Sequence, residues 1–105
     1  MSITKYLEEN YEAITKIQEH ETKDADITFK HNNKYYAIEI ETGTLLKKPK
    51  QLAEKISYLN TKYKDRWMFI VTNKNNLSKY KKLGFATQRT SFEKDLKKWL
   101  KINTQ

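Results

Sequence analysis

Three carboxylates lie close together in the stretch ADITFKHNNKYYAIEIET, residues 25–42. Two β-rich runs flank an Asn-Asn pair, and asparagine tolerates the positive φ that a two-residue hairpin loop needs. Counting outward from that loop pairs Asp26 with Glu39, whose Cβ atoms would then be about 5 Å apart. Glu41 follows two residues later on the same strand face, about 7 Å further along.

Like charges on one face of a sheet are destabilising unless something compensates them. A hard divalent cation is the natural compensator, because Mg²⁺ binds oxygen ligands and takes one or two carboxylates together with waters and substrate phosphate. The pattern therefore indicates a metal site. The same three residues would also fit a half-exposed sheet whose carboxylates face solvent, and spacing alone leaves both interpretations open.

The alternation of side chains across a strand divides this hairpin into two faces. One face is apolar and carries Ile27, Phe29, Tyr36, Ile38 and Ile40. The opposite face carries Asp26, Thr28, Ala37, Glu39 and Glu41. A one-residue slip would expose the whole apolar set, so the pattern favours this register.

The remaining segments predict an α/β fold in a single domain spanning residues 1–105. Residues 12–18 fit either a continued helix or a strand, and the resemblance described below favours a strand. RWMFIVT, at 66–72, is a continuous apolar run typical of a buried central strand. Helices are expected at 2–10, 50–63, 76–82 and 91–101, and a further strand at 84–88.

Basic residues are concentrated in the second part of the chain. Residues 1–61 carry 9 Lys/Arg and 10 Asp/Glu, whereas residues 62–105 carry 12 and 3, and the net charge is +8. A basic surface favours a polyanionic partner, of which nucleic acid is the commonest. A solvated, lysine-rich surface would give the same composition.

The composition also excludes several classes of site and protein. The chain has no cysteine, which excludes disulfides, thiolate zinc sites and cysteine nucleophiles. No stretch approaches the roughly 18 apolar residues of a membrane span, and the first residues lack the apolar core of a signal peptide. We therefore expect an intracellular, cytoplasmic protein that does not contact the membrane.

The carboxylate-bearing hairpin resembles the motif region of the PD-(D/E)xK, or restriction-endonuclease-like, nucleases. KDADITF and AIEIETG place Asp26 and Glu39 13 residues apart. In that superfamily an acidic residue begins one strand, and an acidic residue, one intervening residue and a lysine lie on the paired strand. The resemblance covers roughly residues 12–72 and is nearest to Holliday-junction-resolvase-like and RecB-like domains. It implies an α-β-β-β-α-β core with a mixed central sheet flanked by helices.

The resemblance makes Asp26 and Glu39 ligands of Mg²⁺ or Mn²⁺, with the Ile40 carbonyl as a further ligand. Ala25 stands where the family usually has proline, and Glu41 stands where it usually has lysine. A minority of restriction enzymes also carry glutamate there. By that analogy Glu41 acts as a base or as a further metal ligand.

Alternatively, the lysine has moved to Lys55 on the following helix, although an ordinary exposed lysine is equally typical of that position. Gln51 lies one helical turn before Lys55 and matches a glutamine that shapes the site of RecB-like nucleases. The family also has an acidic residue on its first helix. The candidates here are Glu8, Glu9 and Glu12.

The activity implied by the resemblance is metal-dependent hydrolysis of phosphodiester bonds, in DNA, with a homodimer as one arrangement. Glu41 or Lys55 would orient or deprotonate the attacking water. Lys47, Lys48 and Lys50, which follow the hairpin, could bind backbone phosphates or form a solvated loop. The alternative function is a nuclease-fold module that has lost catalysis and serves in DNA binding or assembly.

Overall fold

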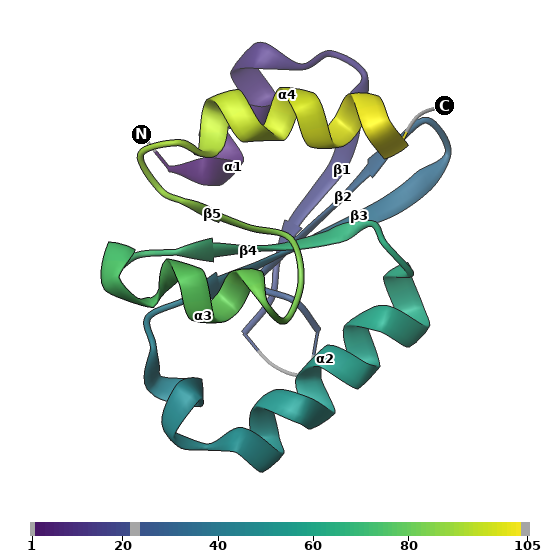
Figure 1. The fold of residues 1–105 in the computed structure, drawn as a ribbon. Helices are drawn as coiled ribbons and strands as arrows, with labels where there is room; N and C mark the ends of the chain where they lie inside the picture. Colours follow the sequence, from purple (N-terminus) through teal and green to yellow (C-terminus); the bar gives the residue numbers. More distant parts are fainter. Residues whose placement is uncertain (1, 22–23, 104–105) are drawn as a thin grey trace.

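One five-stranded sheet organises the computed structural model, which describes residues 2–21 and 24–103 (Figure 1). β1 (Ile14–Glu19), β2 (Ile27–His31) and β3 (Lys34–Glu41) form an antiparallel meander. β4 (Trp67–Val71) and β5 (Ala86–Gln88) continue the sheet parallel to β3, so the strand order is β1-β2-β3-β4-β5. The sheet is therefore mixed.

Four α-helices in the described part of the chain cover the sheet in two layers (Figure 1). α1 (Ile3–Asn10) and α4 (Phe92–Asn103) lie on one face, and α2 (Pro49–Tyr63) and α3 (Leu77–Lys81) lie on the other. Parallel neighbours need a crossover, which α2 supplies between β3 and β4. The two 3-10 turns, η1 (Thr44–Lys47) and η2 (Lys74–Asn76), precede α2 and α3.

The turn between β2 and β3 has the predicted backbone conformation. Asn32 and Asn33 have φ values of 56° and 64°, which a two-residue turn of the hairpin type requires. The register is also confirmed: His31 pairs with Lys34 and Ile27 with Ile38. The assignment of side chains to the two hairpin faces follows directly from this pairing.

The sheet face under α1 and α4 is an apolar core. It buries the predicted set from β2 and β3, together with residues from both helices, and Ile40 packs partly buried at its edge. The buried members are Ile3, Tyr6, Leu7, Ile14, Ile27, Phe29, Tyr36, Ile38, Met68, Ile70, Phe92, Leu96, Trp99 and Leu100. The other face packs Leu52, Leu59 and Tyr63 of α2 against Trp67, Phe69, Val71 and Tyr80.

Most of the predicted element positions are confirmed, with local differences at the ends. The ambiguous segment at 12–18 is the strand β1, and the Ser2 hydroxyl caps α1 by accepting the N–H of Lys5. The helix predicted at 76–82 is shorter, because a 3-10 turn precedes it, and the strand predicted at 84–88 retains only three residues. No helix among the described residues has the length and apolar character to cross a bilayer.

Candidate metal and catalytic site

Two glutamates of β3 are buried beneath α2 and α3. Glu39 is 2% exposed and Glu41 is 3% exposed, and both point to the sheet face opposite the apolar set of the hairpin. Their neighbours on β4 are Phe69 and Val71. The interpretation that these carboxylates lie on a solvated sheet is therefore wrong. A buried carboxylate needs a specific partner, because burial without one costs several kcal/mol.

Asp26 lies just before β2 and is joined to the same strand. Its Oδ2 accepts the backbone N–H of Ile40 at 2.7 Å, and the pairing of Ile27 with Ile38 places it beside Glu39. Asp26 is only partly buried. The predicted grouping of Asp26, Glu39 and Glu41 at one end of the hairpin is thus present, with Asp26 as the member nearest the solvent.

Lys55 reaches this cluster from α2. Its Nζ lies 2.6 Å from Glu39 Oε1, and its side chain remains 28% exposed. Burial acts to lower the pKa of Lys55, but the adjacent carboxylates, Glu39 above all, outweigh it and raise that pKa. Lys55 is therefore a protonated lysine held at the carboxylates rather than an ordinary surface residue.

Tyr80 of α3 is a fifth member of the cluster that the sequence did not indicate. Its hydroxyl donates to Glu41 Oε2 at 3.3 Å, and its side chain is fully buried. Burial, reinforced by the nearby Glu41 charge, raises the pKa of Tyr80 to about 12, so it acts as a hydrogen-bond donor. Its position 39 residues from Glu41 depends on how α3 packs.

The two glutamates have more buried oxygen atoms than their partners in the described chain satisfy. Among the described residues, Glu39 Oε2 and Glu41 Oε1 are buried without a hydrogen-bond partner. Burial raises the pKa of Glu39 and of Glu41 above their ordinary value, although Lys55 lowers both and Tyr80 also lowers that of Glu41. The nearby Asp26 carboxylate raises both further. A cation would relieve this excess of buried acceptors.

The donor set fits a magnesium-type ion. No three His, Asp or Glu side chains within 2–21 and 24–103 form a ready-made ligand group by themselves. Mg²⁺, however, needs only one or two carboxylates, with waters and substrate oxygens completing its shell. Asp26 and Glu39 can supply these carboxylates, the Ile40 carbonyl is the third candidate, and Glu39 Oε2 has no competing partner within the described chain.

A cleft of about 780 Å³ gives solvent access to the Asp26 side of the cluster. Asp26 and Ile40 line it together with His20 and Arg89 and with the start of α1. The cleft is therefore large enough to admit part of a polymeric substrate next to Asp26, whereas Glu39 and Glu41 do not line it. Arg89, which follows β5 directly, is a basic lining residue that the sequence patterns did not indicate.

The other predicted site residues lie outside the buried cluster. Lys47 ends η1, and Lys48, Lys50 and Gln51 surround the start of α2; all four are exposed. Glu8, Glu9 and Glu12 are also exposed, on or just after α1, which covers the opposite face of the sheet. None of the three is therefore favoured as a member of this site.

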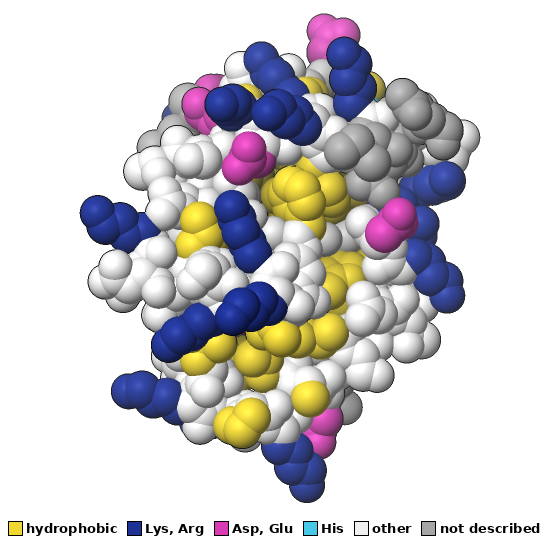
Figure 2. Space-filling view, in the orientation of Figure 1, with side chains coloured by type: hydrophobic (Ala, Val, Ile, Leu, Met, Phe, Trp, Pro, Cys, Tyr) yellow, Lys and Arg dark blue, Asp and Glu magenta, His cyan; other side chains and the backbone are white. Residues whose placement is uncertain are grey.

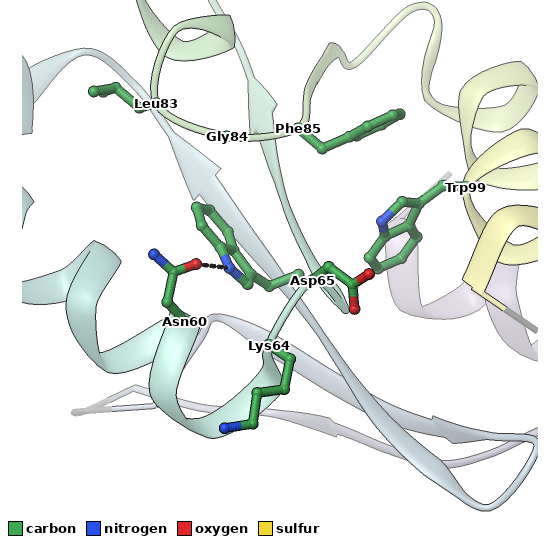
Figure 3. A pocket seen from close by; sticks show the side chains of 8 residues that line it. Asn60, Lys64, Asp65, Leu83, Gly84, Phe85 and Trp99 are labelled. Atoms are coloured by element: carbon green, nitrogen blue, oxygen red, sulfur yellow. Dashed lines mark hydrogen bonds between the residues drawn. The ribbon is translucent and has the colours of Figure 1, made fainter.

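The surface in the view of Figure 2 shows hydrophobic side chains surrounded mainly by lysine and arginine. A pocket of about 530 Å³ lies away from the carboxylates, between the end of α2, Phe85 and Trp99 (Figure 3). Trp67 lines it and donates its indole N–H to Asn60 Oδ1 at 2.8 Å. Trp67 and Trp99 are 5% and 2% exposed, so both are core residues.

Comparison of the chain with known protein families, with curated proteins and with solved structures finds no match.

Proposed function

We propose that the protein is a metal-dependent nuclease that hydrolyses phosphodiester bonds in DNA. One observation carries the proposal: two buried glutamates with unpaired oxygens lie beside a lysine, on the strand paired with Asp26. A protein that needed only stability would gain nothing from this arrangement, because each buried charge is costly. Buried carboxylates whose pKa is raised, with a specific charged partner, are typical of functional sites, and Asp26 beside them lines a cleft.

The order of elements from α1 to β4 supports the assignment to the restriction-endonuclease-like fold. It is helix, three antiparallel strands, helix and parallel strand, which is the α-β-β-β-α-β core that the motif resemblance implies. Asp26, just before the first strand of the hairpin, and Glu39, on the second strand, stand at the motif positions. Because a fold by itself does not establish an activity, the functional argument rests on the site.

Each charged residue of the cluster has a distinct role in the proposed reaction. Asp26 and Glu39 would hold Mg²⁺ or Mn²⁺, which when bound polarises a phosphate and lowers the pKa of a coordinated water. Lys55 is kept protonated by Glu39 and can bind the negative oxygens of the phosphate. Glu41 is suited to accept the proton of the attacking water, because its raised pKa makes it a stronger base than an ordinary carboxylate.

A cleavage assay on labelled DNAs tests the proposal. Single-stranded, duplex, flap and four-way-junction DNAs are incubated with Mg²⁺, Mn²⁺ or EDTA. We expect metal-dependent products from the wild type, none from Asp26→Asn or Glu39→Gln, and a loss of about 10²–10³-fold in Lys55→Ala. Glu54→Gln is the matched control, since Glu54 is an exposed glutamate next to Lys55 on α2 and should cut normally.

The alternative is an inactive nuclease-fold module for DNA binding or assembly. The presence of Glu41 at the motif's lysine position, with Tyr80 bonded to it, favours this alternative. It predicts DNA binding without cleavage in either metal, and binding that is the same in Asp26→Asn as in the wild type. That result would exclude the nuclease.

A further inference from the structure

A second polar pocket, of about 560 Å³, lies at the opposite end of β3 from Glu41. It lies on the α2 side of the sheet, and His20 lines both this pocket and the cleft at Asp26. Its lining combines amide, basic and aromatic side chains, including Gln18, Asn33, Lys34, Tyr35, Lys62 and Arg66. This set offers hydrogen-bond groups, positive charge and an aromatic ring within one pocket.

The charge of this pocket is positive. Its one carboxylate, Asp24, is already neutralised: Lys62 Nζ lies 2.7 Å from its Oδ2, and the Tyr63 hydroxyl donates to its Oδ1 at 2.6 Å. Lys34 and Arg66 remain as further cations. The Nε of Arg66 donates to the Tyr35 carbonyl at 3.1 Å, which holds the guanidinium at the pocket wall. An anionic ligand such as a phosphate group fits this balance of charge.

The aromatic ring in the pocket is open to solvent. Tyr35 is 45% exposed, the largest exposed fraction among the large hydrophobic side chains described as exposed, although its neighbour Tyr36 is fully buried. Lys30 Nζ lies 5.8 Å from the centre of the Tyr35 ring. Exposed aromatic rings beside cations are the pattern by which proteins bind single-stranded nucleic acid, because bases stack on the ring while cations contact the backbone.

The pocket and the carboxylate cluster lie on the same face of β3, at opposite ends of the strand. Tyr35 and Glu39 are four residues apart on the same face of β3, so their Cα atoms are separated by about 13 Å. Lys62 follows Lys55 by seven residues, two turns of α2, which places the two lysines on one side of the helix about 10 Å apart. Ala37, between Tyr35 and Glu39 on β3, is fully buried beneath α2, so the pocket and the cluster are two separate places on this face.

We propose that this pocket binds an unstacked nucleotide of single-stranded DNA. The base stacks on Tyr35, and the adjoining phosphate is bound by Lys34 and Arg66, the two cations of the pocket that Asp24 does not engage. A base inside a duplex cannot offer its face to a side chain, so the pocket selects single strands or frayed ends. The link from this pocket to cleavage rests on the proposed nuclease function, whereas the binding itself does not.

Fluorescence anisotropy in EDTA tests the binding without cleavage. The probes are a labelled oligothymidine and a labelled hairpin duplex of equal length. We expect Tyr35→Ala to weaken binding of the single strand about tenfold, Tyr35→Phe to retain it, and the duplex affinity to stay within about twofold. Phe85→Ala is the control, because Phe85 is a similarly exposed aromatic, 40% exposed, that lines a different pocket.

A salt titration adds a readout that a folding defect would not give. Lys34 is exposed, and Lys34→Gln should reduce the slope of log affinity against log salt by about 0.7 for the single strand. Unchanged binding in Tyr35→Ala, or an equal loss for duplex and single strand, overturns the proposed pocket. If the wild type cuts DNA with metal while Tyr35→Ala binds normally, only the pocket fails. If Tyr35→Ala loses single-strand binding but no variant cuts, only the nuclease fails.

Discussion

The two faces of β3 use neighbouring residues in opposite ways. Ile38 and Ile40 turn toward α1 and α4, where Ile38 joins a continuous apolar core. Glu39 and Glu41 turn toward α2 and α3 and are buried almost as completely. Burial of the isoleucines stabilises the folded state, whereas burial of the glutamates is unfavourable because their carboxylates are removed from water. The contrast supports the proposal that the α2 face of β3, which also contributes to a core, holds a site in addition to maintaining the fold.

The largest effect on stability is expected from a comparison of two adjacent tyrosines on opposite faces of β3. Tyr36→Ala should lower the free energy of unfolding by about 3–5 kcal/mol, because it leaves a cavity in the apolar core. Tyr35→Ala, one residue away on the other face, should change it by no more than about 0.5 kcal/mol. Urea unfolding of both variants measures the difference, and equal losses would show that the two faces are not distinct.

A smaller effect is expected from removing one buried charge. Because burial raises the pKa of Glu41 in the folded protein, the wild type loses stability as the pH rises above the ordinary glutamate value of 4.5. Glutamine does not titrate. In metal-free buffer, Glu41→Gln should therefore match the wild type near pH 4 and exceed its free energy of unfolding by about 1–2 kcal/mol at pH 8.

Unfolding curves at a series of pH values give this comparison directly. Ile38→Val supplies the control on the other face, since its cost, about 0.5–1.5 kcal/mol, should not vary with pH. A constant difference between Glu41→Gln and the wild type from pH 4 to pH 8 would contradict the account of a desolvated carboxylate.

The smallest effect concerns the hydrogen bond between Tyr80 and Glu41. Tyr80→Phe keeps the ring but removes the donor, which should cost about 1 kcal/mol of stability. Because that hydrogen bond lowers the pKa of Glu41, its loss should raise this pKa further. The ascending limb of the pH–rate profile for cleavage should therefore move to higher pH. A profile identical to that of the wild type would show that Tyr80 does not influence the protonation of Glu41 during cleavage.

The hairpin was the most predictable part of the molecule. Its register followed from an Asn-Asn turn and a period-two apolar pattern, two local signals that agree. The place of Lys55 beside the carboxylates was also predictable, because the motif resemblance pointed to the helix after the hairpin. The deep burial of Glu39 and Glu41 could not be predicted, because the same alternation of side chains is typical of a sheet with one solvated face.

Tyr80 and the pocket around Tyr35 illustrate what sequence patterns omit. Tyr80 joins Glu41 only because α3 packs against β4, and no local spacing reports such a long-range contact. The pocket draws residues from β1, the hairpin and the end of α2, so its members are scattered along the chain. The ends of α3 and β5 differed from prediction because a 3-10 turn and a short edge strand have weak periodic signals.

Calorimetric titration of Mn²⁺ into the metal-free protein tests most directly whether the α2 face holds a metal ion. We predict saturable binding to the wild type, weakened at least about tenfold in Asp26→Asn and in Glu39→Gln and unchanged in Glu54→Gln. The wild-type affinity should also rise with pH, because the metal displaces protons from carboxylates whose pKa burial has raised. Heats that are the same in all four proteins would contradict the metal site and, with it, the proposed nuclease.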